Sequence, residues 1–118
     1  MYDRMPIPAW VDGRLALTGD AAHPMLQYLA QGACQAVEDA YVLAGEAAKS
    51  GAQDGVDWDR ALKAYETART GRTARVQSSA RVWGDIWHVD GVARLLRNEL
   101  MRDRAPGDYR HIDWLYGS

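Results

Sequence analysis

The chain has 118 residues, 47% of them hydrophobic, which is enough for one small domain with a core of its own. Its 14 basic and 16 acidic residues give a net charge of -2, so nothing general favours nucleic acid or an anionic membrane as a partner. The single cysteine, Cys34, excludes an internal disulfide framework and suits a reducing compartment. No apolar run approaches the ~20 residues that cross a bilayer, so we expect a soluble, cytoplasmic protein.

The first part of the chain is predicted to be extended. Residues 1–13 contain Pro6 and Pro8, which disfavour a helix, and we expect them to form a connector. Gly13 then begins a turn into one short strand within residues 14–18, which ends at Gly19. A lone strand needs a partner, so it either joins another chain or belongs to a sheet in sequence that this chain does not contain.

The rest of the chain is predicted to be mainly α-helical. Residues 14–50 should contain the strand, a Gly-Asp loop and a helix from Gly32 to about Lys49, and residues 50–55 a loop. The apolar face of that helix should comprise Ala33, Val37, Ala40, Tyr41, Ala44 and Ala48. Further helices are expected within residues 57–105, one capped by Asp57 and running past Gly71, the next starting after Gly91. Residues 106–118 form a tail, and no boundary indicates a second domain.

Three arginines recur at threefold spacing on the second predicted helix. Arg69, Arg72 and Arg75 would form a basic ridge. We interpret this ridge as a solvated face or as a set of ion pairs with Glu66, because charge runs are usually surface features.

Two features near the predicted strand can bind a ligand. Asp20 follows the strand and can accept hydrogen bonds from hydroxyl groups, and Gly19 lets the backbone pass close to a ligand. The helix starting at Gly32 offers free backbone N–H groups, which attract negative charge. The same spacing also suits a tight turn with a capping carboxylate, and spacing alone does not separate the two interpretations.

Other reactive side chains are given structural interpretations. His23 precedes Pro24, has no carboxylate partner nearby in sequence, and is expected to have a structural role. Cys34 is expected to be packed on a face of small residues rather than reactive. His88 and His111 lack metal-ligand spacing, so no metal is assigned.

The longer pattern resembles a known family. The sequence GDAAHP at Gly19–Pro24, with Gln31-Gly32 and Glu38-Asp39-Ala40, resembles the second flavin-binding motif of the class A flavoprotein aromatic hydroxylases. The lead-in at Trp10–Arg14 and the helix with Tyr65-Glu66 resemble the same family. Val82–Gly91, Arg97–Leu100 and the ending Asp113–Gly117 look most like its 3-hydroxybenzoate 6-hydroxylase branch.

The resemblance implies a fold, a cofactor and site residues. The chain would be the C-terminal helical part of an α/β FAD-binding monooxygenase, with Gly19 and Asp20 bonding the ribityl or phosphate part of FAD. Backbone N–H groups of Gly32, Ala33 and Cys34 would face the pyrimidine edge of the flavin. Gln27 and Tyr28 lie between these two groups, so they are candidates for the substrate side of the ring, with ordinary loop packing as the alternative.

The same resemblance implies an activity and an incomplete site. NADH or NADPH would reduce FAD, and a phenolic acid such as hydroxybenzoate would be hydroxylated. The family's Gly-x-Gly-x-x-Gly turn and central sheet should precede Met1, so we expect the chain to need a missing N-terminal half for activity. The alternative is a non-catalytic interaction module that self-associates through aromatic residues and Leu95, Leu96 and Leu100.

Overall fold

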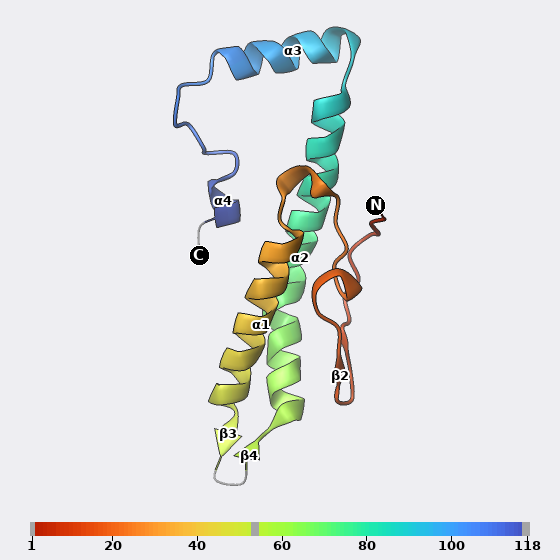
Figure 1. The fold of residues 1–118 in the computed structure, drawn as a ribbon, viewed down its shortest axis with the longest axis vertical. Helices are drawn as coiled ribbons and strands as arrows, with labels where there is room; N and C mark the ends of the chain where they lie inside the picture. The colour runs from red at the N-terminus through yellow and green to blue at the C-terminus, as the bar shows by residue number, and fades with distance from the viewer. Residues whose placement is uncertain (1, 53–54, 117–118) are drawn as a thin grey trace. The chain divides into compact units, whose positions relative to one another are not determined.

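The computed structural model describes residues 2–52 and 55–116, and its helices dominate (Figure 1). The chain divides into two compact units, 1–83 and 84–118, a division that the sequence did not indicate. They are described separately below. No helix among the described residues is long and apolar enough to cross a membrane.

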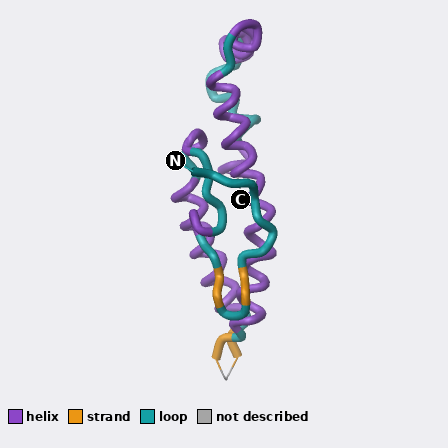
Figure 2. The backbone as a smooth tube through the Cα atoms, turned by 90° about the vertical axis from the view of Figure 1, so that its right-hand side faces the viewer, coloured by secondary structure: helices purple, strands orange, loops and turns teal. Residues whose placement is uncertain are grey.

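The first unit begins with a β-hairpin rather than a lone strand. Strand β1 (Val11–Asp12) pairs antiparallel with β2 (Leu15–Ala16), as the tube in Figure 2 shows. Gly13 opens the two-residue turn at φ +56°, the positive φ that tight hairpin turns favour at this position. The strand predicted within 14–18 is therefore shorter than expected, and its partner comes from the predicted connector of this same chain.

Helix α1 has the predicted bounds, Gly32–Lys49, but buries a different face. Its buried residues are Gln35 and Asp39, whereas Val37 is 70% exposed and Tyr41 is 82% exposed. The apolar row at helical spacing is therefore not the face that α1 buries in this chain. Polar side chains bind α1 to the next helix instead, so the apolar row is left uncovered.

A short hairpin and most of a long helix complete the first unit, and the last residues of that helix, from Gly84 on, belong to the second. Strands β3 (Gly51–Ala52) and β4 (Gly55–Val56) pair where a loop was expected, and Gln53 and Asp54 lie outside the described residues. Helix α2 (Trp58–His88) runs past Gly71 as predicted. Asp57 caps it, because its Oδ1 accepts a hydrogen bond from the Arg60 N–H at 3.1 Å.

The core lies between the first hairpin, the loop after it, α2 and the part of α1 that carries Val42 and Leu43. Trp10, Ala22 and Tyr65 form its centre, with the rings of Trp10 and Tyr65 5.9 Å apart. The Tyr65 hydroxyl donates to the Leu17 carbonyl at 3.0 Å, and Glu66 accepts the backbone N–H groups of Trp10 and Val11. These bonds attach the hairpin to α2 and so fix where the next loop begins.

The second unit carries α3 (Gly91–Arg102), which starts where predicted, and a short α4 (Asp113–Tyr116) within the expected tail. Arg97 donates to the backbone carbonyls of Ile86 and Trp87 at 3.1 and 2.8 Å, joining α3 to the end of α2. The apolar side chains of α3 are exposed: Val92, Leu95, Leu96, Leu100 and Met101.

Candidate functional site

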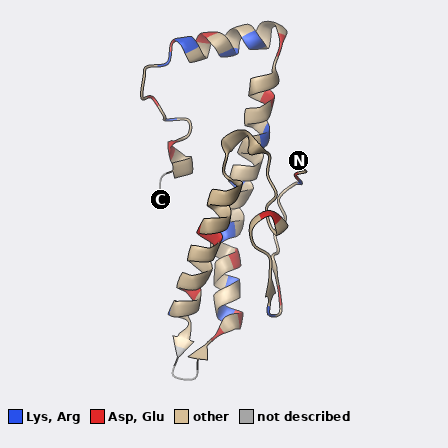
Figure 3. Cartoon of the chain, in the orientation of Figure 1, with Lys and Arg blue, Asp and Glu red and all other residues tan. Residues whose placement is uncertain are grey.

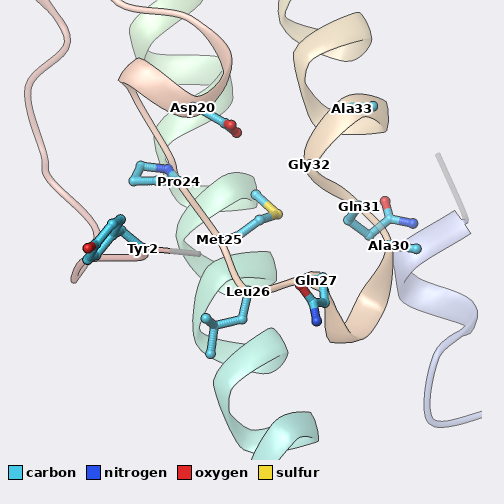
Figure 4. A pocket seen from close by; sticks show the side chains of 10 residues that line it. All are labelled: Tyr2, Asp20, Pro24, Met25, Leu26, Gln27, Ala30, Gln31, Gly32 and Ala33. Atoms are coloured by element: carbon cyan, nitrogen blue, oxygen red, sulfur yellow. The ribbon is translucent and has the colours of Figure 1, made fainter.

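A pocket of about 290 Å³ opens between the loop after the first hairpin and the start of α1 (Figure 4). Two short 3-10 helices shape it, η1 (Gly19–Ala21) and η2 (Gln27–Leu29). Its lining comprises Tyr2, Asp20, Pro24, Met25, Leu26, Gln27, Ala30, Gln31, Gly32 and Ala33. Four of the predicted site residues therefore lie around one space.

Asp20 and Gly32 lie close together across this pocket. A methyl group placed on Gly32 would lie 3.9 Å from Asp20 Oδ1, and Asp20 itself is exposed to solvent. Figure 4 shows the Asp20 carboxylate directed toward the start of α1. Gly19 adopts φ +54° just before it, a backbone conformation that costs other L-residues about 1–2 kcal/mol. The predicted carboxylate and the predicted helix end thus face the same space.

The amino end of α1 carries free backbone donors. Gln31 precedes the helix and makes no side-chain capping bond, and helix geometry gives the N–H groups of Gly32, Ala33 and Cys34 no acceptor within the helix. Cys34 is exposed, so the expectation that it is packed is wrong in this chain, although it is not among the residues lining the pocket. A helix end of this kind favours negative charge nearby.

The two substrate-side candidates are placed differently. Gln27 is exposed and lines the pocket, whereas Tyr28, 37% exposed, is outside the described lining. Ala30 follows them at φ +52°, and this left-handed turn brings the chain back to the start of α1. Ala30 and Met25 were not predicted to line the site, and Gln31 was named only as part of the motif and given no role. Their place between the Gly-Asp motif and the helix start was the available signal.

Behind the pocket, His23 has a carboxylate partner that the sequence analysis did not foresee. The His23 Nε2 lies 2.6 Å from Asp39 Oδ2, and both side chains are fully buried. The same oxygen accepts the Gly19 N–H at 2.9 Å, and Asp39 Oδ1 accepts Arg69 Nε at 2.8 Å. Burial would raise the pKa of Asp39, but the bonds from His23, Gly19 and Arg69 hold it below its ordinary value.

Two arginines of the predicted ridge face α1 rather than solvent. Arg69 is 2% exposed and donates to Glu38 and Asp39, and Arg72 makes two hydrogen bonds to Glu38, at 2.6 and 2.8 Å. Figure 3 shows acidic residues on α1 beside basic residues on α2. Glu66, the expected partner, instead binds Lys63 and the hairpin backbone. The pKa of Glu38 falls to about 2. The hydrogen bond from Arg72 is the main cause, and burial of the carboxylate acts in the opposite direction.

The described residues contain no group of three or more His, Cys, Asp or Glu side chains that could hold a metal ion. The His88 Nδ1 lies 2.7 Å from the Gly84 carbonyl within α2. The polar side chains that line the pocket are the Asp20 carboxylate, the amides of Gln27 and Gln31 and the phenol of Tyr2, and the start of α1 adds helix N–H groups. Together they suit an uncharged or anionic organic ligand with hydroxyl groups.

The comparisons with known proteins identify the family. Residues 3–80 match the family model described as FAD binding domain. The chain is 52% identical over 119 residues to 3-hydroxybenzoate 6-hydroxylase 1 of Aquipseudomonas alcaligenes, and it covers 29% of that protein. It is 51% identical over 116 residues to 3-hydroxybenzoate 6-hydroxylase 2 of the same organism, and it covers 35% of it.

A solved structure shares the fold of this chain. Klebsiella pneumoniae HpxO complexed with FAD and uric acid superposes with a TM-score of 0.74 at 32% identity, over 87% of this chain and 26% of that one. The mainly helical fold is thus confirmed as a piece of an FAD-dependent monooxygenase fold. The chain spans 29% and 35% of the lengths of these two curated relatives.

Proposed function

The chain belongs to the FAD-binding domain family, and from this premise we propose that it supplies part of the flavin site of an FAD-dependent, NAD(P)H-using monooxygenase. The proposed reaction is hydroxylation of a phenolic aromatic acid such as hydroxybenzoate. The observation that carries the proposal is the pocket in which Asp20 faces the uncapped amino end of α1. A carboxylate and helix N–H groups suit, respectively, the hydroxyl-bearing and electron-rich parts of a flavin.

Each group has a separate proposed task. Asp20 accepts hydrogen bonds from the ribityl hydroxyls, and Gly19 lets the backbone approach them. The N–H groups of Gly32, Ala33 and Cys34 face the pyrimidine edge, where the helix dipole stabilises negative charge. FAD, when bound, supplies the electron transfer from NAD(P)H and the oxygen activation that aromatic hydroxylation needs.

Gln27 is the better candidate for contact with the aromatic substrate. It lines the pocket beside the start of α1 and is exposed, so its amide can bond a ligand carboxylate or hydroxyl. Tyr28 lies on the same 3-10 helix but does not line the pocket. If Tyr28 contacts the substrate, the contact must therefore lie outside this pocket.

The pocket and α1 both support the need for further protein. A volume of about 290 Å³ is at the lower end for a drug-sized ligand, so it holds one part of a dinucleotide. The exposed apolar row of α1 containing Val37 and Tyr41 offers a surface for the remainder of the family fold. We therefore propose that activity requires both parts, and that these residues do not hydroxylate a substrate unaided.

A hybrid protein tests the activity. This chain would replace the 119 matched residues of 3-hydroxybenzoate 6-hydroxylase 1, its 52% identical relative. We expect the hybrid to oxidise NADH or NADPH in a manner stimulated by 3-hydroxybenzoate and to release the hydroxylated acid. Gln27→Ala should change the hydroxylation rate or substrate preference while leaving the FAD content intact. A folded hybrid that contains FAD but hydroxylates no phenolic acid would contradict the proposed reaction.

The exposed face of α3 favours a second candidate function, a self-associating helical module. Leu95, Leu96 and Leu100 are 64%, 57% and 76% exposed. If this function is the right one, the chain sediments as a stable dimer that ignores FAD, and Leu95→Ser with Leu96→Ser makes it monomeric. A wild-type chain that sediments as a monomer across micromolar concentrations eliminates this candidate.

A further inference from the structure

Asp39 is buried behind the pocket and has no part in the roles given above. We propose that Asp39 is a positioning residue, whose carboxylate holds the Gly19–Asp20 loop at a fixed place against the amino end of α1 without touching the ligand. The consequence for FAD rests on the proposed function, whereas the placement of the loop concerns this chain alone.

The Asp39 carboxylate joins three separate elements. Its Oδ2 accepts the Gly19 N–H of η1 at 2.9 Å and lies 2.6 Å from His23 Nε2, and its Oδ1 accepts the Arg69 Nε of α2 at 2.8 Å. Gly19 immediately precedes Asp20, so this bond fixes the backbone from which the Asp20 side chain departs. The direction of the Asp20 carboxylate in Figure 4 thus depends on a residue outside the pocket.

Arg69 keeps Asp39 from turning away. Its guanidinium donates to Asp39, to the Glu38 carboxylate and, at 2.8 Å, to the side-chain oxygen of Gln35. Gln35 lies in the first turn of α1, three residues after Gly32. The same arginine therefore holds both the positioning carboxylate and the helix end that faces the pocket.

His23 must act as a donor in this arrangement. Its Nδ1 is buried with no hydrogen-bond partner among the described residues, and its ring lies 5.4 Å from that of Trp10. A proton on Nδ1 would be a buried, unsatisfied donor, whereas a proton on Nε2 bonds Asp39. The geometry therefore favours the tautomer with hydrogen on Nε2.

An amide cannot replace this carboxylate. Three donors converge on Asp39, and a carboxylate presents acceptors on both of its oxygens. In Asp39→Asn, the amide can take two orientations. If its oxygen faces Gly19 and His23, its NH₂ group faces the Arg69 guanidinium, which is also a donor. If the amide is flipped, its NH₂ group faces the Gly19 N–H and the His23 ring. Either rotamer leaves at least one buried donor unpaired, although the side-chain volume is almost unchanged.

NMR-detected amide exchange on the 118-residue chain tests the placement of the loop. Asp39→Asn is compared with Glu38→Gln, which removes a carboxylate from the next residue but no bond to the loop. We expect Asp39→Asn to speed exchange of the Gly19 amide by about tenfold or more beyond the change that its global stability explains, and Glu38→Gln to leave the rate corrected in the same way within about threefold. The ¹⁵N shifts of His23 should report the Nε2–H tautomer in the wild type and its loss in Asp39→Asn.

Three results overturn the inference: a wild-type Gly19 amide that exchanges at its unstructured rate, equal acceleration in both variants, or no acceleration in Asp39→Asn. FAD titration of the hybrid protein then measures the consequence, with a loss of affinity of about tenfold expected for Asp39→Asn alone. A wild-type hybrid that binds no FAD contradicts the proposed function, while amide exchange still decides the placement. Equal FAD affinity in wild type and Asp39→Asn contradicts the inference alone.

Discussion

At the scale of single residues, replacing Gly32 should affect folding stability and ligand binding in opposite directions. It begins α1 at a φ that other residues adopt, and an added methyl group would meet Asp20 Oδ1 at an ordinary 3.9 Å. Gly32→Ala should therefore stabilise the folded chain by about 0.4–1 kcal/mol through the unfolded state. The methyl group would nevertheless enter the pocket, so FAD affinity of the hybrid should fall by about tenfold.

Thermal unfolding and FAD titration of the same Gly32→Ala sample measure the two effects. Gly45→Ala is the matched control, because Gly45 lies within α1 and an added methyl group there would meet no neighbouring atom within 4 Å. Unchanged FAD affinity in Gly32→Ala would mean that the ligand does not approach the start of α1.

Glu38 should make stability depend on acid. Its pKa is lowered from 4.5 to about 2, chiefly by Arg72, so the unfolded chain takes up the proton first as the pH falls. The contribution of Glu38 is complete above about pH 5 and is lost as the pH falls toward 2. Because its side chain is 34% exposed, solvent screening reduces that contribution to about 1 kcal/mol.

Urea unfolding of wild type and Glu38→Gln at pH 7, 4 and 3 checks this prediction. Glu38→Gln should be less stable at pH 7 and should lose less stability on acidification. A smaller slope should remain, because the pKa of Asp39 is also lowered. Parallel pH profiles for the two proteins would show that Glu38 does not titrate as described.

At the scale of elements, a substitution in the exposed apolar row of α1 should have different effects in the isolated chain and in the hybrid protein. Tyr41 is 82% exposed in this chain, so Tyr41→Lys should leave the melting temperature of the isolated 118 residues within about 2 °C. In the hybrid protein the same change would place a charge where the remainder of the fold is proposed to pack, and it should lower both melting temperature and FAD content. Tyr41→Phe is the control, and equal effects of Tyr41→Lys in both contexts would contradict this packing.

Some of the elements could be predicted from the sequence, and others could not. The bounds of α1 were predictable because a long alanine-rich periodic run lies between Gly32 and Ser50, and η1 was marked by the Gly-Asp motif. The hairpin was missed because Val11–Asp12 is only two residues long, too short for a periodic signal. The buried face of α1 was missed because periodicity selects apolar residues, whereas here the polar Gln35 and Asp39 are buried by partners on other elements.

The contacts of the site needed the fold itself. His23 and Arg69 lie 16 and 30 residues from Asp39 along the chain, and no local pattern indicates that their side chains converge. The pairing of Arg69 and Arg72 with α1 likewise depends on where α2 lies after the second hairpin. Asp20 and Gly32 were predicted as candidate positions from the Gly-Asp motif and the helix start, and the structure places both in the lining of one pocket. That they bind a ligand stays a prediction.

At the scale of the whole molecule, the chain matches only part of the architecture of its relatives. It covers 29% of 3-hydroxybenzoate 6-hydroxylase 1 and 26% of the FAD-complexed HpxO chain. Asp20 and the amino end of α1 form a pocket at the low end of ligand-site volumes, and the apolar row of α1 is open to solvent. Both features support the proposal that the flavin site draws its other walls from further protein.

The most direct test of this account is the dissociation constant of FAD in the hybrid protein, measured by flavin fluorescence for wild type, Asp20→Ala and Asp59→Ala. Asp59 is an exposed carboxylate in the first turn of α2 and controls for the loss of one negative charge. We predict that Asp20→Ala weakens FAD binding by about tenfold or more, while Asp59→Ala leaves it within about twofold. Equal dissociation constants for wild type and Asp20→Ala would contradict the central claim that Asp20 holds the flavin.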